Sequence, residues 1–108
     1  MGASSFVVSG KGESERDVFL ELCREAVRIY GSSPYNGTIS TTDLGDTVSF
    51  IGNYSPVKDK KIVYNFLRNV FNGNCSKEYA AEKYVAKCIK LIYVDGTKEF
   101  VFYGLAAT

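Results

Sequence analysis

The chain has 108 residues, of which 45% are hydrophobic and 14% aromatic, which is typical of one folded domain with its own core. Thirteen basic and twelve acidic residues give a formal net charge of +1, so no overall field attracts nucleic acid or an anionic membrane. The chain has no histidine, so it lacks the usual general base near neutral pH and the commonest metal ligand. We therefore expect a protein that is not an enzyme and that holds neither a metal nor a cofactor.

The three cysteines, Cys23, Cys75 and Cys88, are widely spaced and form no CxxC pair. An odd, scattered set is typical of a reducing compartment and argues against a disulfide framework or a zinc site. No apolar run approaches the length of a membrane span. These features predict a cytoplasmic protein with no membrane partner.

The first half of the chain predicts a strand, a helix and a hairpin. Residues 4–9 are β-prone and predict an edge strand. Ser14 then caps a helix whose apolar stripe continues to Tyr30, and Gly31 is the expected residue after its end. After Pro34, residues 37–42 predict one strand and residues 47–51 a returning strand, with a turn between them.

The second half predicts a helix and a second hairpin. Apolar residues recur as pairs from Ile62 to Phe71, which indicates a second amphipathic helix that ends before Gly73. A short helical turn is expected within residues 76–82. The strands predicted at 84–94 and 98–103 flank Asp95-Gly96, a favoured two-residue hairpin turn.

This element order predicts one α+β domain over residues 1–108. We expect a two-layer sandwich with a mainly antiparallel sheet, covered on one face by the two helices. Eight tyrosines and seven phenylalanines are many for this length, and aromatic residues are enriched in interface cores. The composition therefore indicates a homo-oligomer.

Several short motifs resemble a family of small proteins carried by bacteriophages and prophages. The resemblance lies in the opening Met1-Gly2-Ala3, in Tyr30-Gly31, in Tyr35-Asn36-Gly37-Thr38-Ile39 and in the closing Phe102-Tyr103-Gly104-Leu105-Ala106. That family typically begins MGA, has a YG…YxGTI centre and ends near FFGWA; this chain has Leu105 where tryptophan is usual. The resemblance implies a phage-type protein in the host cell cytoplasm. By analogy with small phage proteins that lack enzymatic signatures, it implies a counter-defence role.

The same central stretch holds the best candidate site. Tyr30 and Tyr35 offer flat rings on which a base could stack, and Asn36 offers an amide. If Gly37 begins a strand, Thr38, Ser40 and Thr42 project from one face. A row of hydroxyl groups suits either a small polar ligand or a solvated sheet face, and both interpretations stay open.

Two basic residues could meet the phosphate of such a ligand. Lys11 lies in Gly10-Lys11-Gly12, just before a predicted helix N-terminus, where backbone N–H groups and the helix dipole favour an anion. Arg28 lies near the end of the same helix. A plain strand-to-helix loop is the alternative interpretation of the glycine-rich stretch.

We therefore expect a non-catalytic, phage-type counter-defence protein that binds and sequesters a small phosphorylated, nucleotide-derived ligand. The expected ligand-binding residues are Tyr30, Tyr35, Asn36, Thr38, Ser40, Lys11 and Arg28. The alternative is a protein-binding inhibitor of a host defence factor, with no small-molecule ligand. The even charge balance argues against a nucleic-acid partner, and an enzyme that pairs a Ser or Thr nucleophile with Lys is a weaker third hypothesis.

Overall fold

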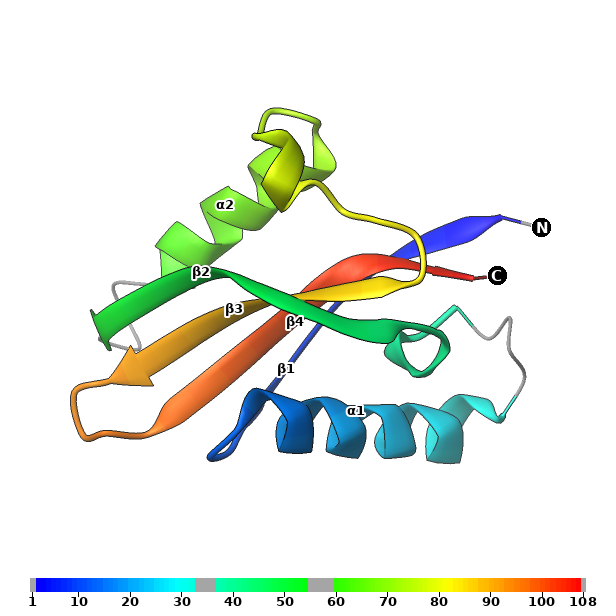
Figure 1. The fold of residues 1–108 in the computed structure, drawn as a ribbon, viewed down its shortest axis with the longest axis horizontal. Helices are drawn as coiled ribbons and strands as arrows, with labels where there is room; N and C mark the ends of the chain where they lie inside the picture. Colours follow the sequence, from blue (N-terminus) through cyan, green and yellow to red (C-terminus); the bar gives the residue numbers. More distant parts are fainter. Residues whose placement is uncertain (1, 33–36, 55–59, 108) are drawn as a thin grey trace.

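The fold is a four-stranded mixed sheet packed by two helices, as seen in a computed structural model that describes residues 2–32, 37–54 and 60–107 (Figure 1). In chain order the elements are β1 (Ala3–Lys11), α1 (Glu15–Tyr30), η1 (Ile39–Thr41), β2 (Asp43–Tyr54), α2 (Lys60–Phe71), η2 (Lys77–Tyr79), β3 (Val85–Tyr93) and β4 (Lys98–Ala107). The strand order is β1-β4-β3-β2. Strand β4 pairs antiparallel with β1 and β3, whereas β2 runs parallel to β3.

Helix α1 begins and ends on signals present in the sequence, and α2 ends on one. At the start of α1, the Ser14 side chain accepts a hydrogen bond from the backbone N–H of Asp17 at 3.2 Å. Gly31 and Gly73 follow α1 and α2 with φ of +89° and +78°, a conformation that glycine adopts without a Cβ penalty. The two predicted helices are confirmed. Neither of these described helices is long and apolar enough to cross a membrane.

The edge strand and the last hairpin are also confirmed. Strand β1 covers the predicted residues 4–9 and lies at the outer edge beside β4. The turn between β3 and β4 is longer than the two residues predicted, because β3 ends at Tyr93 and Val94 belongs to the turn. The Tyr93 N–H donates to the Thr97 carbonyl at 2.8 Å, and Gly96 has φ of +89°. These elements depend on local periodicity and turn chemistry, which a sequence displays directly.

The hairpin predicted from residues 37–42 and 47–51 is wrong. Residues 39–41 form the 3₁₀ turn η1, and the expected turn at 43–46 lies inside the single strand β2. Serine and threonine hydroxyls compete for backbone hydrogen bonds, and here they stabilise a turn rather than a strand. Strand β2 pairs with β3, although α2 lies between them in the sequence. The pairing has a register shift between Leu44 and Thr47.

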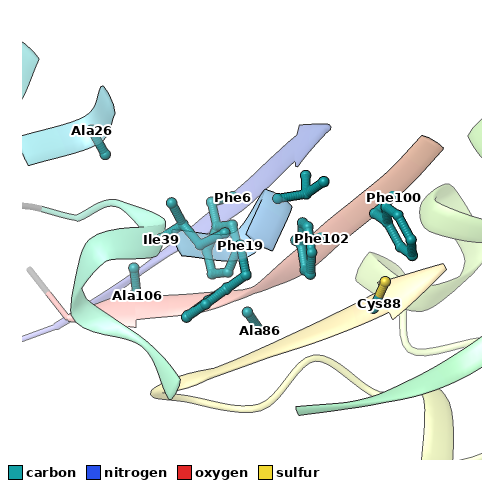
Figure 2. Close-up of a cluster of buried hydrophobic side chains, with 10 residues drawn as sticks. Phe6, Phe19, Ala26, Ile39, Ala86, Cys88, Phe100, Phe102 and Ala106 are labelled. Carbon is teal, nitrogen blue, oxygen red and sulfur yellow. The ribbon is translucent and has the colours of Figure 1, made fainter. Parts of the chain in front are cut away.

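The predicted α+β class with a mainly antiparallel sheet is confirmed, but the two helices lie on opposite faces of that sheet (Figure 1). On the α1 face, Phe19 packs against Phe102 with ring centroids 5.8 Å apart, in a cluster drawn in Figure 2. On the α2 face, Val63 and Val70 pack with Tyr103. The reason is in β4, where Phe100 to Tyr103 are all buried, so both faces of this strand need cover.

A buried lysine fastens η2 to the α2 face of the sheet. The side chain of Lys87 on β3 is only 7% exposed. Its ammonium donates to the carbonyl oxygens of Glu78, at 3.1 Å, and of Ala80. The Glu82 carboxylate lies 3.6 Å from the same nitrogen. A buried charge needs such partners. Lys87 therefore holds the segment before β3, which contains Glu78 and Ala80, against the strand.

The chain enters β3 by passing close to β4 near Gly104. Tyr84 has φ of +70°; its N–H donates to the Leu105 carbonyl at 2.9 Å and its carbonyl accepts from Asp43 N–H at 2.8 Å. Gly104 is buried, and a Cβ on it would overlap the Val85 carbonyl oxygen. Two atoms of the Phe6 ring would lie 3.2 and 3.3 Å from that Cβ. Glycine is therefore the residue that allows these strands to meet.

Candidate ligand-binding groove

A groove of about 590 Å³ lies between α1 and β1 and is closed at one end by residues 37–39. We call it the α1/β1 groove. Its walls are mostly apolar, and they include Phe6 and Val8 from β1 and Ala26, Ile29 and Tyr30 from α1. Ile29 and Tyr30 are 55% and 64% exposed, so the end of α1 presents apolar surface that the protein core does not use.

The groove also has polar side chains, of which Ser5 comes from β1. Glu25 lines it from α1 and Thr38 lines it at the closed end. The hydrogen bond from Arg28, one helical turn away, lowers the pKa of the Glu25 carboxyl, so Glu25 is an anion at neutral pH. The groove therefore combines an apolar body with a carboxylate and a hydroxyl oxygen.

The closed end is fixed by hydrogen bonds to β4 and to α1. The N–H of Gly37 donates to the Ala107 carbonyl at 2.8 Å, and the N–H of Ala107 donates to the Thr41 hydroxyl at 3.2 Å. The Cys23 thiol donates to the Ile39 carbonyl at 3.6 Å. Ile39 itself is buried among the aromatic residues of the α1 face (Figure 2). This end of the groove is thus part of the folded core.

The predicted row of hydroxyl groups on one strand face is not present, because the segment is a turn. Thr38 caps η1 by accepting from the N–H of Ser40, and the hydroxyl oxygens of Thr38 and Ser40 are 2.8 Å apart. The buried Thr42 hydroxyl donates to the Ile39 carbonyl at 2.7 Å. Among these three residues, only Thr38 lines the groove.

The structure brings some of the predicted site residues together and separates others. Tyr30 and Thr38 line the same groove, and Ser40 contacts Thr38. Arg28 is exposed and paired with Glu25 at the rim. Lys11 does not line this groove: its ammonium is 5.2 Å from the centroid of the Tyr93 ring, and it lines two other hollows, one of which shares Leu22 and Glu25 with the groove. The predicted contacts at Tyr35 and Asn36 fall outside the described residues.

Sequence reasoning missed the walls that β1 and Glu25 supply. Strand β1 and helix α1 are consecutive in the chain, but neither segment shows by its sequence that a groove remains between them. The sequence of α1 nevertheless contained a signal for the groove, because the helix has more apolar residues than the core buries. Ile29 is the residue that shows this excess most clearly.

The thiols near this face are poorly suited to nucleophilic chemistry. Burial raises the pKa of Cys23, and burial together with the nearby Glu15 carboxylate raises the pKa of Cys88 to about 12. The thiolate is the reactive form, and little of it is present at neutral pH in either side chain. Neither Cys23 nor Cys88 lines the groove.

We expect Thr41→Val to loosen the closed end of the groove. The change removes the hydroxyl that accepts from Ala107 N–H and donates to the Thr38 carbonyl at 2.9 Å. Valine keeps the volume, so the expected loss in the free energy of unfolding is that of hydrogen bonding, about 1–2 kcal/mol. Urea denaturation measures it; an unchanged midpoint would show that these bonds do not fix the segment.

Known proteins add no function to this geometry. No protein-family model matches the chain. No curated protein matches it, and no solved structure does. The similarity to phage-borne proteins in the sequence motifs stays a prediction.

Proposed function

We propose that this protein is a non-catalytic binding protein that holds a small nucleotide-derived ligand in the α1/β1 groove. The observation that carries the proposal is the groove itself. Its volume of about 590 Å³ lies within the range of small-molecule sites, roughly 300–1,000 Å³. Its mostly apolar walls with a few polar groups also match the usual composition of such sites.

The residues at the groove suit a planar base with a polar edge. The Tyr30 ring offers a face for stacking, and Ile29 extends the apolar wall. The Glu25 carboxylate accepts hydrogen bonds from ring or exocyclic N–H groups, which an adenine or guanine edge supplies. Thr38 is the polar residue at the closed end. We place the base between Tyr30 and β1.

A phosphate on the ligand would leave the groove at its rim, next to Arg28. The guanidinium of Arg28 already binds an anion there, the Glu25 carboxylate, and guanidinium geometry also suits phosphate. Lys11 lines a neighbouring hollow that shares Leu22 and Glu25 with this groove. We assign the phosphate to Arg28 because its guanidinium is bonded to Glu25 itself. Sequestration of such a ligand is the counter-defence role that the phage-type resemblance implies.

The test is a thermal-shift and calorimetry panel of mononucleotides, dinucleotides and cyclic nucleotides. A ligand at one hundred times its Kd stabilises the native state by about 2.7 kcal/mol, which gives a clear rise in Tm. We expect Tyr30→Ala to weaken binding tenfold or more, because it removes the stacking face. Ile62→Ala is the control, since Ile62 is also a largely exposed apolar residue but lies on α2 and lines neither this groove nor the hollow beside Val7.

Two results would overturn this proposal. One is the absence of any shift across the panel. The other is turnover: the ligand recovered after heat denaturation should be intact, and a product in its place would mean an enzyme.

A second candidate function is inhibition of a host protein that docks on β1. Within the described part of the chain, the outer edge of β1 has no strand beside it, so its backbone can pair with an extended segment of another protein. Native mass spectrometry of the protein purified from an infected host distinguishes the two. A bound mass of several hundred daltons supports the first candidate, and a host protein in fixed ratio supports the second.

A further inference from the structure

Strand β1 is an edge strand without the features that normally protect an edge. It is nine residues long, and from Ala3 to Gly10 it has no charged residue and no proline. Its pairing with β4 is continuous from Ala3 to Lys11, with no bulge to twist the edge away. Edge strands usually carry lysine, proline or a bulge because an unprotected edge pairs with other chains. Such an edge is expected to be covered.

Apolar surface flanks this edge on both faces of the sheet. On the α1 face, Ile29 and Tyr30 stand over the α1/β1 groove. On the α2 face, Val7 is 47% exposed and borders a hollow of about 310 Å³ that Tyr64 and Phe71 also line. A strand added beside β1 would cover both surfaces at once. Its side chains would therefore have to be apolar on both faces.

The sequence of β1 meets that requirement against itself. Around Val7 the strand reads Ser5-Phe6-Val7-Val8-Ser9, which is nearly symmetrical in chemistry. In an antiparallel pair centred on Val7, each Phe6 lies opposite the Val8 of the second copy, and each Ser5 lies opposite Ser9. Every directly opposed pair in this segment is apolar with apolar or hydroxyl with hydroxyl. Within this segment no charge is brought against a like charge.

We propose that the protein forms a two-fold dimer in which the β1 strands of two copies pair antiparallel about Val7. The symmetry axis is perpendicular to the sheet, so the two four-stranded sheets join into one continuous sheet of eight strands. Both copies of α1 lie on the same face of it. The open sides of the two α1/β1 grooves then face each other across the paired β1 strands.

The dimer extends the floor of each groove. Phe6 and Val8 line the groove of their own chain, and their counterparts continue the same surface beside them. Ile29 and Tyr30, exposed in one chain, gain an apolar neighbour. This consequence for the ligand rests on the proposed function, whereas the pairing of β1 does not.

Light scattering and native mass spectrometry over a range of concentrations test the pairing. We expect a mass twice the 11.9 kDa of one chain. Val7→Lys places two ammonium groups opposite each other at the centre of the interface and should weaken the dimer at least a hundredfold. Val94→Lys is the matched control, because Val94 is exposed in the hairpin turn, and it should leave the dimer unchanged.

A cysteine at the axis tests the register. Directly opposed residues of an antiparallel pair have Cβ atoms about 4.5–5.5 Å apart, close enough for a disulfide to form with small adjustments. Val7→Cys should therefore give a covalent dimer on mild oxidation, and Val94→Cys should not. Circular dichroism of Val7→Lys should match the wild type, which shows that the monomer is folded.

The outcomes separate this inference from the proposed function. A wild-type protein that is monomeric at every concentration, or a Val7→Lys variant that stays dimeric, overturns the pairing. A host protein that co-purifies in fixed ratio and is lost in Val7→Lys also overturns it, because β1 then pairs with a foreign strand. If folded Val7→Lys monomer binds nucleotide as tightly as the dimer, the composite groove is overturned while the proposed function stands. A dimer that binds no nucleotide supports the pairing and contradicts the proposed function.

Discussion

Replacing Gly104 by alanine is expected to lower the free energy of unfolding by about 3 kcal/mol or more. A Cβ at this position would overlap the Val85 carbonyl oxygen and press on the Phe6 ring. Backbone cannot rotate aside as a flexible side chain does, so β4 or the entry to β3 must shift. Chemical denaturation followed by far-ultraviolet circular dichroism measures the loss.

Gly73→Ala is the control for this prediction. Gly73 has φ of +78°, and among the described residues no atom lies within 4 Å of the place that a Cβ would take. Alanine there costs only its unfavourable backbone conformation, about 1 kcal/mol. The difference between the two variants in the free energy of unfolding separates the steric clash at Gly104 from the backbone conformational cost at Gly73. Equal losses in the two variants would contradict the close approach of β4 to Val85.

Replacing Lys87 by methionine is expected to lower the free energy of unfolding by about 2–3 kcal/mol. Methionine keeps most of the volume of the stem but leaves the carbonyl oxygens of Glu78 and Ala80 without their ammonium donor. The segment that contains η2 should then detach from β3 before the rest of the protein unfolds. Hydrogen exchange should show faster exchange in residues 77–82 than in β3 and β4.

Lys77→Met is the matched control, because Lys77 lies in η2, the turn that Lys87 holds, but its own side chain is exposed. Removal of an exposed charge there should change stability by less than about 0.5 kcal/mol. A Lys87→Met protein as stable as the wild type would show that the buried ammonium is replaceable by apolar packing, as some buried ion pairs are.

The elements that the sequence predicted correctly are those with local signals. The Ser14 cap, Gly31 and the last hairpin each depend on signals within a few residues, although the hairpin turn includes Val94 as well as the predicted Asp95-Gly96. Residues 37–42 were misassigned because Thr and Ser suit a strand and a hydrogen-bonded turn equally well. Their hydroxyls bond to the backbone two or three residues away, a choice that strand propensity does not capture.

The arrangement of the elements required information that lies far apart in the chain. The parallel pairing of β2 with β3 forms across α2, and no pattern within β2 indicates its partner. The unbroken apolar run from Phe100 to Tyr103 indicates a strand that is buried on both faces. Such a strand requires cover on both sides of the sheet, which the two helices provide. Tyr30 and Thr38, which the sequence singled out by their chemistry, both line the groove, whereas the wall that β1 contributes was not predicted.

The adjacency of β1 and β4 has a consequence for how the protein folds. The pairing of Ala3 with Ala107 joins opposite ends of the chain, whereas the β3–β4 hairpin closes locally. Contacts of such high sequence separation have the largest loop-closure entropy and are expected to form late. The hairpin is therefore the expected nucleus, and β1 the last strand to dock. The α1/β1 groove then exists only after that final step, so ligand binding in a refolding experiment should appear with the slowest phase and not with the burst of secondary structure.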